Sequence, residues 1–233
     1  MNQFYLTISF IVLMLLTSCT SGLAETKSQV DAEWVKYNRA MEVNDYQVAK
    51  NSVYSMLSLD SNNVTYYDTL AKLYYLTKEY ESSYTCAKKA LTNGVSEQTA
   101  DIAYRTSKAL KKFEDASKYG GILLTFNEDS IGLQYELAFN YIQLYKYDKG
   151  SELLNRIVLD PESLKQNYNE YSGTAVQEIP YRASAYNLLG FIENERGNKE
   201  VAKNMFQSAL NIKEDYKLAS ENLSALNEDI KDQ

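Results

Sequence analysis

The sequence predicts an all-α fold in which helix pairs stack one after another. The 233-residue chain contains only two prolines and nine glycines, so long helices meet few residues that end or weaken them. The stretch 185–215 reads as two amphipathic helices joined by a tight turn at Gly197-Asn198. Its pattern of small and large apolar residues recurs in four earlier stretches, which follow one another at steps of 33 or 34 residues.

Small residues in this stretch stand where the two helices would cross. A side chain larger than Gly190 or Ala202 would push the helices apart, while Tyr186 and Phe206 fill the space beside the crossing. This spacing resembles the tetratricopeptide repeat, a helix–turn–helix unit of 34 residues. The proline that follows the second helix in that family is absent, and Glu214 stands near its place. The resemblance implies a right-handed α-solenoid of about five units plus a C-terminal capping helix.

The other units follow in order along the chain. We expect them at about residues 30–63, 64–94, 95–128 and 129–161, before the unit at 185–215. After Tyr216 one further amphipathic helix presents Leu218, Leu223 and Leu226 to the last unit, as a capping helix does. The third unit is the weakest, because Gly120-Gly121 in its second helix costs about 1 kcal/mol per glycine relative to alanine. We favour close helix packing as the reason for these glycines, and a soft point in the solenoid is the alternative.

The regular step breaks before the fifth unit. That interval is 52 residues, an excess of 18, and the excess falls in the polar segment 161–180, which contains Tyr168 and Tyr171. Insertions in repeat proteins map to loops and often lie on a binding face. A tolerated surface excursion is the favoured interpretation, and a functional insertion stays open.

The N-terminus has the pattern of a targeting segment. Its apolar run Phe4–Leu16 has 13 residues, too few to span a bilayer and typical of a signal-peptide core. The run ends in Leu-Thr-Ser-Cys, which resembles the bacterial lipobox, and this implies cleavage before Cys19 and lipidation of its thiol. The segment before the run has no Lys or Arg, so a plain secretory signal and an uncut membrane anchor are alternatives. The predicted organisation is a signal peptide at 1–18, a flexible tether at 19–30 and the solenoid at 31–233.

Composition argues against several classes of function. The net charge is −7 and the sequence shows no face rich in Lys and Arg, so we expect no nucleic-acid partner. The absence of histidine removes the commonest general base and the commonest metal ligand. No phosphate-binding loop, metal cluster or nucleophile–base pair is recognisable, so we expect no enzyme activity, no cofactor and no metal. An enzyme that uses Glu193 with Glu195, or Asp68 with Asp101, is the alternative.

Two residue types have ordinary structural explanations. Cys86 is the one cysteine expected to keep a free thiol after processing, and its place in a helical stretch predicts a small buried residue. The 21 tyrosines are expected to pack between stacked helices with their hydroxyls at the wet edge.

The family resemblance also implies a binding groove lined by the first helices of successive units. Helical spacing places a set of side chains there, off the stripe that packs on each partner helix. The middle of the groove is basic. Asp68 stands four residues before Lys72, and Asp101 stands four residues before Arg105, so a solvated, salt-bridged face is the commoner explanation for these cations. Beyond lies an aromatic stretch, which either anchors a partner or packs on itself and the insertion. The predicted partner-binding residues are Trp34, Asn38, Lys72, Tyr75, Arg105, Lys108, Tyr135, Phe139, Asn187, Phe191 and Asn194.

These features together predict an adaptor anchored to the cell envelope by lipid. It would hold a protein or peptide partner in the groove and assist assembly of an outer-membrane or cell-surface complex. The architecture resembles accessory lipoproteins of outer-membrane insertion machines and pilot proteins of secretins, at the level of shape alone. The outer membrane is favoured, since no aspartate follows Cys19. We expect a monomer, and the rival is a structural spacer that self-associates through tyrosine-rich faces.

Overall fold

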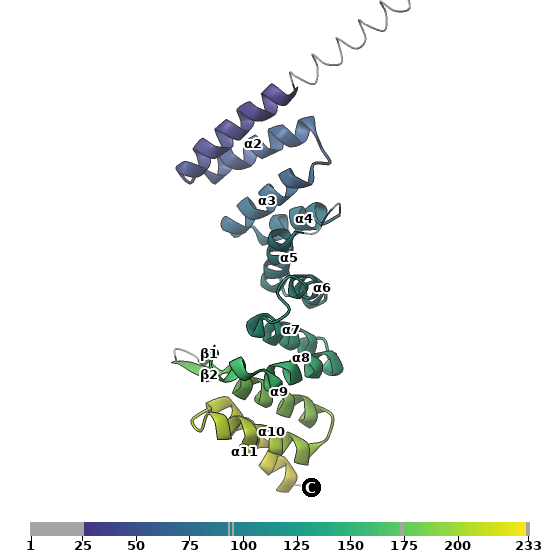
Figure 1. Cartoon of the computed structure of the whole chain (residues 1–233), viewed down its shortest axis with the longest axis vertical. Helices are drawn as coiled ribbons and strands as arrows, with labels where there is room; N and C mark the ends of the chain where they lie inside the picture. The colour runs from purple at the N-terminus through teal and green to yellow at the C-terminus, as the bar shows by residue number, and fades with distance from the viewer. Residues whose placement is uncertain (1–25, 93, 95, 173–174, 232–233) are drawn as a thin grey trace, which may run out of the picture. The chain divides into compact units, whose positions relative to one another are not determined.

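The computed structural model describes residues 26–92, 94, 96–172 and 175–231. The chain forms two compact units that divide between Thr106 and Ser107, inside helix α5. Apart from one short 3-10 helix and one β-hairpin, the regular structure of the described residues is α-helical (Figure 1).

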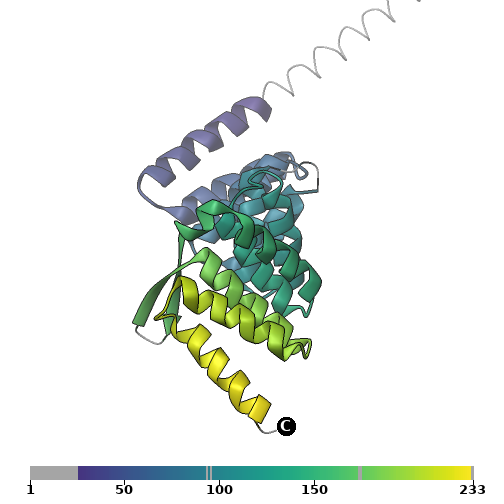
Figure 2. The same ribbon diagram turned by 60° about the horizontal axis from the view of Figure 1, so that its bottom comes forward.

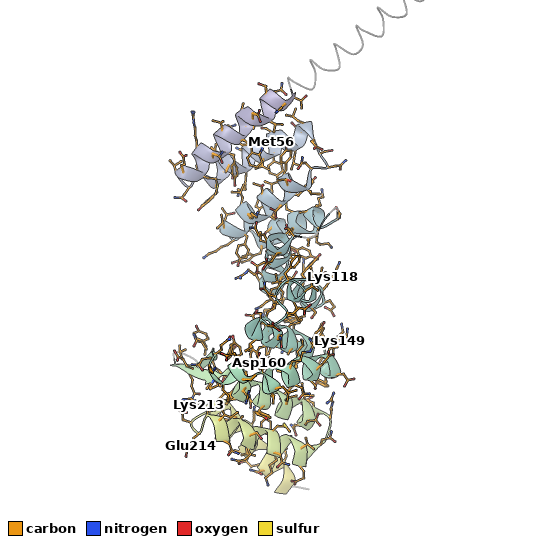
Figure 3. The ribbon with its side chains drawn as sticks, viewed as in Figure 1. Met56, Lys118, Lys149, Asp160, Lys213 and Glu214 are labelled. Carbon is orange, nitrogen blue, oxygen red and sulfur yellow. The ribbon has the colours of Figure 1, made fainter. Side chains whose placement is uncertain are left out.

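Unit 1 is built from helix pairs joined by short turns. Its elements are helix 26–42 (purple in Figure 1), α2 (Tyr46–Leu59), α3 (Val64–Leu76), α4 (Tyr80–Ala90) and the first part of α5 (Glu97–Ala109). Residues 26–30 are helical, so the predicted tether is too long at its C-terminal end. The core lies between the helices and includes Met56 of α2, which is fully buried and labelled in Figure 3.

Unit 2 continues with the same kind of helix pair. Its helices after α5 are α6 (Phe113–Leu124), α7 (Ile131–Gln143), α8 (Tyr147–Leu159), α9 (Tyr181–Glu195), α10 (Lys199–Ile212) and α11 (Lys217–Lys231). One apolar cluster joins α7, α8 and α9, and a smaller one joins α10 to α11 through Phe206 and Leu226. The second helices of the five pairs begin at Tyr46, Tyr80, Phe113, Tyr147 and Lys199, which confirms the predicted steps.

The same turn joins the two helices of every pair. One residue in each turn has a positive φ, between 55° and 79°. The next residue donates its backbone N–H to a carbonyl five positions back at 2.8–2.9 Å, as in a Schellman motif. The predicted turn at Gly197-Asn198 is confirmed, but the other four positions are not glycine. The five residues with positive φ are Asn44, Lys78, Lys111, Tyr145 and Gly197.

The predicted small-residue crossing between α9 and α10 is confirmed. A Cβ placed on Gly190 would lie 2.6 Å from two ring carbons of Phe206, which is closer than real side chains approach. Phe206 and Ala202 are both buried, so the ring has no free space to retreat into. Close packing does not explain Gly121, because a Cβ there would meet no atom within 4 Å.

The insertion is more ordered than a surface excursion implies. It forms a 3-10 helix (Pro161–Leu164) and two antiparallel strands, β1 (Asn167–Ser172) and β2 (Ala175–Pro180). Asp160, labelled in Figure 3, caps the 3-10 helix and accepts a hydrogen bond from Arg182 at its backbone oxygen, 2.6 Å away. Figure 2 shows the hairpin beside the start of α9 and the connection between α10 and α11. An otherwise all-α unit thus carries a docked hairpin.

Candidate functional site

Of the two predicted binding residues in helix 26–42, one packs against other side chains and the other is exposed. The ring of Trp34 is half-buried and lies edge-on to Tyr37, with centroids 5.1 Å apart, and 6.1 Å from Tyr66 of α3. Asn38 is exposed. Trp34 therefore contributes to packing between the first helix and α3.

The cations of the predicted basic spot have acidic partners. In unit 1, Lys72 pairs with Asp68 at 2.6 Å, and Arg105 pairs with Asp101 at 2.7 Å. The hydrogen bond to Asp101 raises the pKa of Arg105. In unit 2, Lys108 pairs with Glu136 at 2.7 Å. The salt-bridge explanation is therefore correct, and partly exposed pairs of this kind contribute at most about 1 kcal/mol each.

Tyr75, also in the predicted set, lies beside one of these pairs. Its ring is 5.9 Å from that of Tyr80, and its hydroxyl lies near the Arg105 guanidinium. The side chain is half-buried and belongs to α3, whereas Arg105 belongs to α5.

Two phenylalanines of unit 2 are exposed on neighbouring helices. Phe139 of α7 is 45% exposed and Phe191 of α9 is 38% exposed. They occupy equivalent positions of the fourth and fifth repeats, and α7 and α9 are in contact. Asn194, one turn beyond Phe191, is half-buried. We call Phe139, Phe191 and Asn194 the α7/α9 face; rings this open to water carry a solvation cost that a partner would remove.

Tyr135 and Asn187 are corrections to the predicted binding set, because neither is open to solvent. Tyr135 is 7% exposed, and its ring lies 4.9 Å from Tyr168 of β1 and 5.4 Å from Tyr181 of α9. Asn187 is 2% exposed and accepts a 2.9 Å hydrogen bond from Asn222 of α11. Helical spacing assigned both residues to the groove, and it could not predict the segments that bury them.

A polar cluster that the sequence patterns did not predict lies under the hairpin. The carboxyl of Glu170 in β1 lies near the hydroxyl of Tyr216, the residue just before α11. Burial raises the pKa of Glu170, and the nearby charge of Glu221 adds to the effect. Burial likewise raises the pKa of Tyr135 well above its usual range. The sequence signal for this hairpin is the turn-forming pair Ser172-Gly173, because polar and apolar residues lie on both faces of the strands and do not alternate.

The carboxylates considered for catalysis have structural partners. Hydrogen bonds from Asn198 and Arg196 lower the pKa of Glu193, and Glu195 accepts a 3.3 Å hydrogen bond from Tyr147. Within the described ranges, no group of three acidic or cysteine side chains is placed to hold a metal ion. Cys86 is buried as predicted, and burial raises the pKa of its thiol to about 11.

Membrane attachment is not addressed by the described residues. Across them, no helix has the length and apolar character needed to cross a bilayer. Cys19 and the apolar run before it lie outside the described ranges.

Several solved structures have a similar arrangement of helix pairs. YrrB, a TPR protein with an unusual peptide-binding site, matches with a TM-score of 0.59 and 18% identity, over 79% of this chain and 87% of that one. The MamA protein matches with a TM-score of 0.55 and 18% identity, over 81% and 96%. A tetratricopeptide repeat protein from Parabacteroides merdae matches with a TM-score of 0.55 and 15% identity, over 85% and 72%.

The chain has the tetratricopeptide-repeat fold. The predicted fold class, an all-α solenoid of helix pairs with a terminal helix, is therefore confirmed. No protein-family model matches the chain. Among curated proteins, the uncharacterized protein ycf37 of Pyropia yezoensis is 44% identical over 50 residues, which cover 22% of this chain and 28% of that protein. The chain thus spans little more than a quarter of that relative.

Proposed function

We propose that this protein is a scaffold of the cell envelope that binds another protein or a peptide through the α7/α9 face. The observation that carries the proposal is the pair of exposed rings, Phe139 and Phe191, at equivalent positions of two adjoining first helices. Large aromatic side chains are the usual anchors of protein interfaces because each buries a large apolar area at small entropic cost. The ion-paired cations and the net charge of −7 favour a protein partner over nucleic acid.

Two further considerations support this function. YrrB, which shares the fold, is a TPR protein with a peptide-binding site, and the same use of the fold is proposed here. The lipobox-like sequence ending at Cys19 supports attachment to a membrane, with the outer membrane favoured. A diacylglyceryl group together with a further acyl chain gives the two-chain anchoring that stable attachment requires. The bound partner would then assemble beside the membrane surface.

Site-specific photocrosslinking in intact cells tests the binding face. A benzophenone side chain replaces Phe139 or Phe191, and Phe126 serves as the matched control because it is 46% exposed in the turn after α6. We expect the same discrete adduct from positions 139 and 191 and none from 126. An equal yield from all three positions, or none from any, would contradict the proposal. An adduct of twice the chain's mass would instead favour the self-associating spacer.

The lipid anchor is tested separately. The substitution Cys19→Ala is expected to release the protein from the membrane fraction into the soluble fraction. Retention of the variant in membranes would show that attachment does not depend on lipidation.

A further inference from the structure

The β1–β2 hairpin packs against α7 and α9 of unit 2 through only one of its two faces. The pairing register sets Tyr168 opposite Ile179 and Glu170 opposite Gln177, and these four side chains point toward the helices. Ile179 is fully buried, whereas Tyr171, which points the other way, is 72% exposed. The hairpin thus has a bound face and a solvent face, as an extended peptide ligand has.

Tyr168, the first residue on the bound face, is held by contacts with two aromatic rings. The ring of Tyr168 lies 4.9 Å from that of Tyr135 in α7 and 6.1 Å from that of Tyr181 in α9. The two helical rings are themselves 5.4 Å apart in an edge-to-face arrangement. This pair of rings therefore forms a defined seat for one further aromatic side chain, and Tyr135 belongs to the face that helical spacing assigns to binding.

A carboxyl group occupies the position two residues further along β1. The carboxyl of Glu170 lies near the hydroxyl of Tyr216, and its Oε2 is buried without a hydrogen-bond partner among the described residues. On the paired strand, Gln177 donates to the carbonyl of Asp215 at 2.5 Å and accepts from the N–H of Lys217 at 3.3 Å. The seat thus takes a carboxyl group, but the hairpin leaves one oxygen of this group without a partner, at a free-energy cost to its own docking.

We propose that the surface formed by Tyr135, Tyr181 and Tyr216, which we call the hairpin seat, is a recognition site for an extended segment. The segment carries an aromatic residue and, two positions later, a residue with a carboxyl group. The chain's own hairpin occupies this seat as an intramolecular ligand, and a partner segment of the same chemistry replaces it. This inference rests on the proposed function, since it names the kind of partner that unit 2 binds.

The intact hairpin is expected to exclude simple peptides. Both of its ends are joined to the chain, so its effective concentration at the seat is on the order of millimolar or above. A short free peptide cannot compete with it. A partner displaces the hairpin only if it makes additional contacts, and the exposed rings of Phe139 and Phe191 on the same two helices supply them.

The test vacates the seat by truncating the side chains that fill it. The full chain with Tyr168→Ala and Glu170→Ala is titrated into a dye-labelled hexapeptide, Asn-Tyr-Asn-Glu-Tyr-Ser, and fluorescence anisotropy is recorded. The matched control carries Tyr171→Ala and Glu178→Ala, which alter the exposed side chains on the solvent face of the same hairpin. A second peptide has alanine in place of its first tyrosine.

We expect the seat variant to bind the hexapeptide at least tenfold more tightly than the wild type or the control does. The alanine peptide is expected to lose at least tenfold in affinity for the seat variant. A folded seat variant that binds neither peptide, or both equally, overturns the inference. If the double variant does not fold, as judged by circular dichroism, the same comparison is made with Tyr168→Ala alone. These measurements leave Phe139 and Phe191 unchanged, so their failure is distinguishable from failure of the crosslinking experiment.

Discussion

The packing between α9 and α10 makes a quantitative prediction at Gly190. Replacing this glycine by alanine places a Cβ 2.6 Å from Cδ1 and Cε1 of Phe206 and 3.1 Å from its Cγ. Ordinary contact between carbon atoms begins near 3.5 Å, so the ring or the helix must shift by roughly 1 Å. Phe206 is 2% exposed and packs against Leu226 of the terminal helix, so the shift disturbs α11 as well.

The expected magnitude combines two opposing effects. Overpacking in a filled core costs about 1–3 kcal/mol, while alanine is about 1 kcal/mol better than glycine inside a helix. We therefore expect Gly190→Ala to lower the free energy of unfolding by up to about 2 kcal/mol. Urea denaturation followed by circular dichroism measures this difference.

The same substitution made in a Phe206→Ala variant isolates the contact between position 190 and the ring. When Phe206 is first replaced by alanine, the space beside position 190 opens, and Gly190→Ala is then expected to stabilise the protein by about 0.5–1 kcal/mol. The sign of the effect thus reverses with the presence of the ring. If Gly190→Ala stabilises the protein while Phe206 is present, the close crossing of α9 and α10 is refuted.

Three other predictions follow from single positions. Gly121 lies in α6, where an added Cβ would have no atom near it, so Gly121→Ala is expected to raise the free energy of unfolding by about 0.5–1 kcal/mol in urea titrations; a loss would reveal a hidden contact. The raised folded-state pKa of Glu170 favours its neutral form, so this carboxyl contributes stability below its unfolded pKa, about 4.3, and loses it as pH rises through the folded value. Glu170→Gln is therefore expected to be more stable than wild type at pH 7, with the gap closing toward pH 4, whereas Glu178→Gln shows no such trend. The thiol of Cys86, with its pKa raised to about 11, is expected to react with a disulfide reagent at pH 8 about a hundredfold more slowly than in the unfolded chain, measured with Cys19→Ser; equal rates would refute its burial.

Regular features of the repeats could be predicted because they depend on local spacing. The steps between second helices follow from the recurrence of small and apolar residues, and the Gly190–Phe206 crossing follows from one glycine at a helix contact. The turns were predictable only where turn-forming residues mark them, as at Gly197. At Lys78 and Tyr145 the same left-handed conformation is imposed by the helices on either side, against a local cost of about 1–2 kcal/mol.

The candidate site was predictable only in part. Helical spacing placed Phe139 and Phe191 on one exposed face, and it placed Tyr135 and Asn187 on equivalent faces. Whether a face stays open depends on contacts between segments far apart in sequence, such as that between Tyr168 and Tyr135. Periodicity within one helix contains no information about such contacts, so the hairpin and its cover over Tyr135 had to come from the structure.

The measurement that tests the central claim most directly is partner capture by the double variant Phe139→Ala/Phe191→Ala. The crosslinked partner, once identified and purified, is titrated against the wild type, the double variant and Phe126→Ala. Because the two rings are already exposed, the double variant should melt within a few degrees of the wild type. The account predicts that affinity falls at least a hundredfold in the double variant and is unchanged in Phe126→Ala; unchanged affinity in the double variant would contradict it.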